Sequence, residues 1–150
     1  MLHSFYARET MSLIAGFPAA TKSTAAILCP DSGDEVGQLH LASAEIVDSA
    51  VQAAKLYQVE WAAIPAVQRG AILHKACNLI EARSEELSAI VAREAGKSMK
   101  DARGETAGAV LCGRFFAGEG QRMFGRTMPS GAPNKSAMTI REPCGVAALI

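Results

Sequence analysis

Arg141-Glu142-Pro143-Cys144-Gly145-Val146-Ala147-Ala148-Leu149-Ile150 closes the chain, and from Gly145 onward every residue is apolar or glycine. Such a run is typical of a strand buried on both faces, as found in parallel sheets. A parallel strand needs a neighbouring strand and a crossover connection, which is usually a helix. Nothing follows Ile150 in the sequence, so we expect residues 145–150 to be the first strand of a sheet that this chain leaves incomplete.

The composition is that of a globular protein: 150 residues, 49% of them hydrophobic and 20% charged. Fifteen basic residues balance fifteen acidic ones, which disfavours a nucleic-acid partner. No apolar run is long enough to span a membrane. The four cysteines lie too far apart for a paired zinc or redox motif, so we expect free thiols in a cytoplasmic protein. For residues 1–23 we favour a poorly ordered N-terminus over a secretory signal, because no charged region precedes the short apolar patch.

The pattern next predicts a hairpin over residues 24–39, with its turn at residues 30–34, and then four helices. Ser43 is a good N-cap for the first helix, and Pro65 suits the first turn of the second. Ser84 can cap the third helix, and Gly96 is suited to end it. The second helix is expected to bury Ile72, Leu73, Ala76 and Ile80, and the third Leu87, Ile90 and Val91.

The fourth helix is predicted over roughly residues 98–123. One of its faces carries mostly small residues, which permits the close approach of another backbone: Ala102, Thr106, Ala109, Gly113, Phe116 and Gly120. We expect a Pro/Gly loop over residues 127–134, a strand over residues 135–141 and a bend before the terminal strand.

The motifs that suggest chemistry are each better explained structurally. Gly96-Lys97-Ser98 lacks both the preceding strand and the earlier glycine of a phosphate loop, and Gly118-Glu119-Gly120 lies in a helical pattern rather than between a strand and a helix. Cys144 has no histidine nearby in sequence, so we interpret it, like Cys29, Cys77 and Cys112, as a packing residue. His74 falls on a solvated face. Glu94 falls in phase with the apolar stripe of its helix, which predicts a half-buried carboxylate in an ion pair.

Taken together, seven strings in order resemble one family. They are Val47-Asp48-Ser49-Ala50 with Trp61, Arg69-Gly70-Ala71-Ile72-Leu73, Glu94-Ala95-Gly96-Lys97, Ala102-Arg103-Gly104-Glu105, Phe115-Phe116-Ala117-Gly118-Glu119-Gly120, Pro129-Ser130 and Arg141-Glu142-Pro143-Cys144-Gly145-Val146. The region from about Ile27 to Ile150 resembles the N-terminal portion of the NAD(P)-dependent aldehyde dehydrogenase superfamily.

The resemblance implies an α/β fold: the helix-rich N-terminal part of a Rossmann-like cofactor domain, with an incomplete sheet and a hairpin from the oligomerisation element. It divides the chain into the N-terminus (1–23), the hairpin and four helices (24–134), the oligomerisation strand and bend (135–144) and the first strand of the remainder (145–150). The family oxidises an aldehyde to a carboxylic acid with NAD or NADP. The run Phe115–Gly120 with Pro129-Ser130 is most similar to the branch that acts on short semialdehydes.

The family's catalytic cysteine, general-base glutamate and cofactor-binding glycines lie further along and have no counterpart here, so the resemblance assigns no catalytic or cofactor-binding residue to this chain. It implies a monovalent-cation site that uses the Leu28 carbonyl and the Glu105 carboxylate, and a homo-oligomer when the enzyme is complete. Two hypotheses remain open. The chain is the leading segment of such an enzyme and inactive alone, or it is a non-catalytic module that pairs with a full-length homologous subunit. We favour the first, because the terminal strand carries no charge or proline that would protect an edge.

Overall fold

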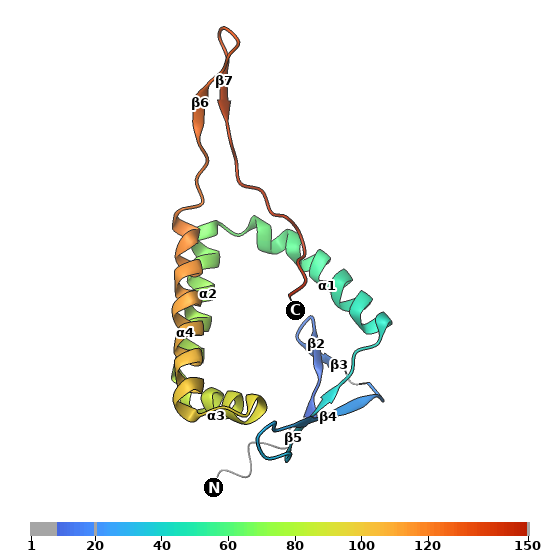
Figure 1. Cartoon of the computed structure of the whole chain (residues 1–150). Helices are drawn as coiled ribbons and strands as arrows, with labels where there is room; N and C mark the ends of the chain where they lie inside the picture. Colours follow the sequence, from blue (N-terminus) through green and yellow to red (C-terminus); the bar gives the residue numbers. More distant parts are fainter. Residues whose placement is uncertain (1–8, 20, 150) are drawn as a thin grey trace.

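The computed structural model describes residues 9–19 and 21–149, which form a mixed α/β structure of four helices and three small sheets (Figure 1). The strands β1 (Glu9–Thr10), β4 (Thr24–Leu28) and β5 (Glu35–His40) make a three-stranded sheet in the order β1-β5-β4. β4 and β5 pair antiparallel, which confirms the predicted hairpin, and β1 pairs parallel with β5. β2 (Ser12–Ile14) and β3 (Phe17–Ala19) form a separate antiparallel hairpin.

These strands change the interpretation of the N-terminus. We predicted a poorly ordered segment over residues 1–23, and the structure instead places β1, β2 and β3 within it. Each of these strands has only two or three residues. Their pairing depends on partners that a short alternating pattern does not reveal, above all the contact of β1 with β5. Residues 1–8 lie outside the described residues.

The helices begin and end close to the predicted positions. α1 (Ala44–Ala63) is capped by Ser43, whose side-chain oxygen accepts from the Ile46 N–H. α2 (Ala66–Ala82) begins after Pro65, and α3 (Ser84–Ala95) ends at Gly96 in the left-handed conformation. α4 (Met99–Ala117) is capped by Ser98 and continues as the short 3-10 helix η2 (Gly118–Gln121). None of the helices in the described part of the chain has the length and apolarity needed to cross a bilayer.

Small residues carry the packing between the helices. α4 packs on α2 and on α3 (Figure 1), and its buried positions are Ala102, Thr106, Val110 and Ala117. An added Cβ at Gly113 would lie 2.6 Å from the Cys77 sulfur, and one at Gly70 would collide with the Ala117 carbonyl oxygen. The predicted close approach of another backbone is confirmed at Gly120, where an added Cβ would collide with the Ala66 carbonyl oxygen. At Gly113 the close neighbour is a side chain, and Ala109 and Phe116, on the same predicted face, are exposed.

The buried faces of α2 and α3 differ from the prediction. Ile72, Leu73, Ala76 and Ile80 of α2 are exposed, and Gly70 and Cys77 are buried instead. In α3 the buried residues are Ser88 and Ala92, while Leu87, Ile90 and Val91 are only half-buried. Because the helices approach at backbone distance, the small residues form the contact and the larger side chains lie beside it. Ser88 Oγ donates to Thr106 Oγ1 at 3.0 Å, which satisfies a buried polar pair.

The last part of the chain is an extended hairpin followed by an irregular tail. β6 (Thr127–Pro129) pairs antiparallel with β7 (Ser136–Met138), so part of the predicted loop over residues 127–134 is a strand. The hairpin extends away from the helices (Figure 1). The strand expected over residues 145–150 is not formed over 145–149, because no described strand lies beside it to pair with its backbone. Val146 and Leu149 are exposed, and Ile150 lies outside the described residues.

Candidate functional site

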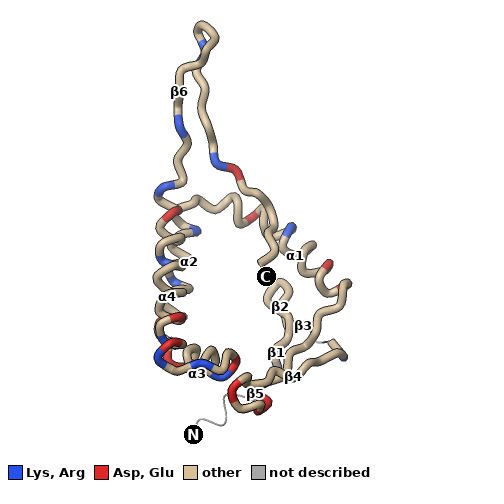
Figure 2. Tube along the Cα trace, in the orientation of Figure 1, with Lys and Arg blue, Asp and Glu red and all other residues tan. Residues whose placement is uncertain are grey.

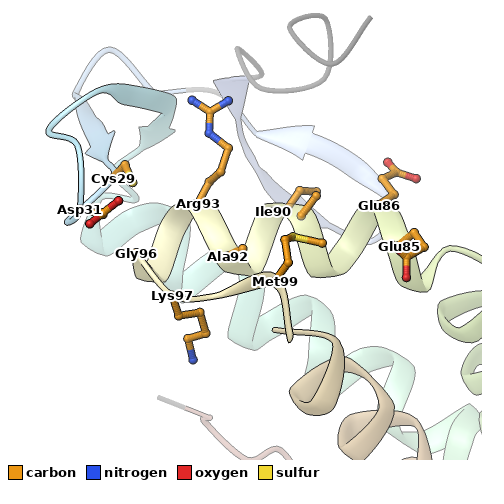
Figure 3. Close-up of a pocket in the computed structure, with 11 residues that line it drawn as sticks. Cys29, Asp31, Glu85, Glu86, Ile90, Ala92, Arg93, Gly96, Lys97 and Met99 are labelled. Carbon is orange, nitrogen blue, oxygen red and sulfur yellow. The ribbon is translucent and has the colours of Figure 1, made fainter. Parts of the chain in front are cut away.

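The largest cavity that we describe, about 640 Å³, lies where the β4–β5 turn meets the C-terminal end of α3. Cys29 and Asp31 approach from the turn, and Gly96 and Lys97 from the chain after α3 (Figure 3). Ala89, Ile90 and Met99 give it apolar walls, and Glu85, Glu86, Ala92 and Arg93 complete the lining. A mostly apolar cavity with a few charged groups at its edge is suited to receive an apolar group.

A close backbone contact at Gly96 positions the turn. An added Cβ at Gly96 would lie 3.0 Å from the Asp31 nitrogen and 3.2 Å from the Pro30 Cβ. Gly96 has φ of +63°, which favours glycine at the end of a helix. Within the turn the Cys29 N–H donates to the Asp34 carbonyl at 2.8 Å, and the Gly33 N–H donates to the Cys29 carbonyl at 2.8 Å. Residue 96 therefore limits how closely the β4–β5 turn, and with it the β1-β5-β4 sheet, approaches α3.

Cys29 has the most distinctive environment of the four cysteines. Hydrogen bonds from the Ser32 backbone, the Ser32 side chain and the Asp31 backbone hold the pKa of the Cys29 thiol below its ordinary value of 9.0. Cys29 and Cys77 are buried, as expected of packing residues. Cys112 and Cys144 are exposed, so the packing interpretation is wrong for these two. The turn residues Asp31 and Ser32 after Cys29 supply these hydrogen bonds, but the sequence alone did not show that they would be directed at the thiol.

In the structure, a lysine side chain already occupies one of the two predicted cation ligands. The Glu105 carboxylate of α4 pairs with the Lys97 ammonium. Leu28 ends β4, directly before the turn that contacts Gly96. A hard cation needs several oxygen ligands, and here it would have to displace an ammonium that already neutralises Glu105. Within the described residues no three His, Cys, Asp or Glu side chains gather as a metal site. The monovalent-cation site at the Leu28 carbonyl and the Glu105 carboxylate stays a prediction.

Two ion pairs fasten α4 to its neighbours. Arg114 contacts Glu81 of α2, and Arg103 of α4 contacts Glu85 of α3, with nitrogen and oxygen 2.9 Å apart in the second pair. The hydrogen bonds from Arg114 and Arg103 hold the pKa of Glu81 and of Glu85 below the ordinary value of 4.5. Both pairs are at least partly exposed, so they orient the helices more than they stabilise them.

The histidines and the glutamate that could take part in chemistry lie apart from one another in sequence. His74 is exposed on α2, as expected. Glu94 is exposed rather than half-buried, because the packing face of α3 runs through Ser88 and Ala92. His40 ends β5, where its Nδ1 lies 3.2 Å from the Thr21 nitrogen.

The described residues also do not fit a dinucleotide site on their own. Such a site needs a glycine-rich turn between a strand and a helix. Gly118 and Gly120 lie in η2 directly after α4, and Gly96-Lys97-Ser98 joins two helices. Neither of these two glycine segments therefore has the strand–turn–helix arrangement that holds a dinucleotide.

Comparison with known proteins gives a family for the chain. The model of the aldehyde dehydrogenase family matches residues 17–150. The non-phosphorylating aspartate-semialdehyde dehydrogenase of Halomonas elongata is 40% identical over 125 residues, which cover 83% of this chain and 25% of that protein. The alpha-ketoglutaric semialdehyde dehydrogenase of Bacillus subtilis is 38% identical, covering 80% and 25%. The chain thus spans about a quarter of the length of the curated relatives it matches.

Solved structures agree with this result. A succinate-semialdehyde dehydrogenase from Burkholderia pseudomallei superposes with a TM-score of 0.86 at 31% identity, covering 93% of this chain and 29% of that one. An NAD-dependent benzaldehyde dehydrogenase from Corynebacterium glutamicum gives a TM-score of 0.76 at 32% identity, covering 83% and 27%.

Proposed function

Because the chain belongs to the aldehyde dehydrogenase family, we propose that it is the N-terminal part of an NAD(P)-dependent enzyme that oxidises a short semialdehyde to a carboxylic acid. In this proposal the chain supplies structure and no reacting group. Residues 24–134 form the helical part of a Rossmann-like cofactor domain, residues 135–144 belong to an oligomerisation element, and residues 145–150 enter the cofactor sheet. The semialdehyde class is supported by the names of the relatives from Halomonas elongata and Bacillus subtilis.

The observation that carries the proposal is the large apolar surface that the described residues leave uncovered. α1 has no buried residue, and it exposes Leu56 and Val59. α4 exposes Leu111, Phe115 and Phe116, and the tail exposes Leu149. Burial of each such side chain stabilises a fold by about 1.5–3 kcal/mol. A surface of this kind is expected of a part that packs against further protein of the same fold.

In this proposal the reacting groups of the family's chemistry come from protein outside this chain. A cysteine thiolate attacks the aldehyde, donors stabilise the oxyanion, and a carboxylate activates water for hydrolysis of the thioester. NAD or NADP supplies the hydride acceptor when bound. In this proposal the chain's contribution to that chemistry is positional, through α1, the α2–α4 pair and the hairpin, with Leu28 and Glu105 as a proposed cation contact.

A chimera tests the proposal. The matched segment of the Halomonas elongata enzyme is replaced by residues 17–150 of this chain, and NAD(P)-linked oxidation of semialdehydes is measured for the chimera and for the 150-residue chain alone. We expect turnover from the chimera and none from the chain. Turnover by the chain alone, or a folded chimera that binds cofactor but does not turn over, would contradict the proposal.

One observation favours the second hypothesis, a module that pairs with a homologous subunit. β4 is one of the two outer strands of its sheet, and Thr24–Leu28 contains no charged residue or proline that would protect this edge. Co-purification of the chain with a full-length relative, abolished by Ala26→Pro and retained by Ala53→Ser in α1, would support this hypothesis. Equal recovery of both variants would count against it.

A further inference from the structure

A second, smaller cavity lies at the base of the β6–β7 hairpin, far from the cavity beside α3. It measures about 300 Å³ and is lined by Phe124, Arg126, Thr139, Ile140 and Arg141. Phe124 and Arg126 belong to the arm that leads into β6, and the other three belong to the arm that leaves β7. Basic residues occur on both arms of the hairpin (Figure 2).

Cross-arm contacts hold this base together. The Thr139 N–H donates to the Arg126 carbonyl at 2.8 Å, and the Arg126 N–H donates to the Thr139 hydroxyl oxygen at 2.9 Å. A Cβ added at Gly125 would collide with the Thr139 carbonyl, so the two arms approach at backbone distance. The backbones of the two arms are thus held side by side at residues 125, 126 and 139.

The two arginines here differ from four other arginines of the chain. Arg83, Arg103, Arg114 and Arg122 each contact a glutamate. Across residues 9–19 and 21–149, no carboxylate lies within ion-pair distance of Arg126 or Arg141, although Glu142 follows Arg141 in sequence. Arg126 and Arg141 therefore line one small cavity, and within the described residues neither is in an ion pair.

From this geometry we propose that the base of the hairpin is a binding site for a phosphate-type dianion. Two guanidinium groups carry the charge that a dianion neutralises, and their planar donor sets match pairs of its oxygens. The Thr139 hydroxyl accepts from the Arg126 N–H and donates its own proton to a third oxygen of the ligand. Phe124 and Ile140 also line the cavity, and both are exposed, so the anion would be bound at the surface.

Protection of arginines against phenylglyoxal, read by peptide mass spectrometry on the full 150-residue chain, tests the site at single-residue resolution. Inorganic phosphate is titrated, with chloride and acetate at matched ionic strength as comparisons. We expect phosphate to slow the modification of both Arg126 and Arg141, and chloride and acetate to be much weaker. Arg122, which already contacts Glu119, is the internal control and should not respond.

Substitution of one arginine tests whether the two form a single site. In Arg141→Gln, the phosphate concentration that half-protects Arg126 should rise about tenfold, the cost of losing a charge-assisted contact. In the matched control Arg122→Gln it should not change. The proposal is overturned if phosphate protects no better than chloride, if acetate protects equally well, or if the half-protecting concentration at Arg126 is the same in Arg141→Gln as in the unmodified chain.

Discussion

Gly70→Ala adds a single methyl group at the closest point between α2 and α4. The Cβ of the new alanine would collide with the backbone carbonyl of Ala117, and its next neighbours are backbone atoms of Ala117 and Gly120. A backbone carbonyl inside a helix cannot rotate away as a side chain can. The two helices must therefore separate locally, which disturbs the most extensive contact between helices in the described structure.

Two opposing effects set the size of the change. Alanine is favoured over glycine within a helix by about 0.8–1.0 kcal/mol. Overpacking a tight contact costs about 1–3 kcal/mol, and a clash with backbone belongs in the upper half of that range. We therefore expect Gly70→Ala to lower the free energy of unfolding by about 1–2 kcal/mol. That corresponds to a urea midpoint lowered by about 1 M.

Gly108→Ala in α4 is the matched control, because nothing lies within 4 Å of its added Cβ. It makes the same chemical change and gains the higher helix propensity of alanine without any overpacking. It should therefore raise the free energy of unfolding by about 0.5–1 kcal/mol. Urea unfolding of each variant is followed by helical circular dichroism. If Gly70→Ala raises the midpoint as Gly108→Ala does, α2 and α4 are not in backbone contact at residue 70.

Three further predictions concern other contacts. Gly113→Ala should be destabilising, because its Cβ lies 2.6 Å from the Cys77 sulfur, and Cys77→Ala in the same chain should remove most of that penalty in urea unfolding; an additive double variant would contradict the contact. The pKa of Glu81 is lowered by Arg114, so the stability it contributes is present above its ordinary value of 4.5 and is lost as the pH falls through the lowered value. Glu81→Gln should therefore lose less stability than the unmodified chain on acidification from neutral pH to below that value, and an identical loss in both would refute the linkage. Leu149 is 96% exposed, so Leu149→Lys should raise the saturation concentration of the chain, and an unchanged value would mean that Leu149 is already covered in solution.

Local signals made the helix boundaries predictable. Ser43 and Gly96 act through bonds and dihedral angles within a few residues, and both fulfil their predicted roles. The predicted cap at Ser84 is wrong, because Ser84 is the first residue of α3 and Arg83 occupies the N-cap position without a side-chain bond. The β4–β5 hairpin was equally local, since its turn chemistry lies within residues 30–34.

The buried faces could not be predicted with the same success, because they depend on non-local packing. Leu73 and Ile80 have the spacing of a core face, yet Gly70 and Cys77 form the contact, because the facing surface of α4 is itself made of small residues. The parallel pairing of β1 with β5 joins segments almost thirty residues apart in sequence. The environment of Cys29 depends on donors from Asp31 and Ser32, two of them backbone N–H groups, and residue-type patterns do not record their direction.

Reconstitution in trans tests the central claim most directly. The 150-residue chain is mixed with a truncated semialdehyde dehydrogenase from Halomonas elongata that lacks its own matched segment, and the formation of NADH or NADPH is followed after aldehyde is added. The account predicts that neither component is active alone and that the mixture is. Activity of the chain by itself, or a tight complex that stays inactive with both cofactors and with aspartate semialdehyde, would contradict it.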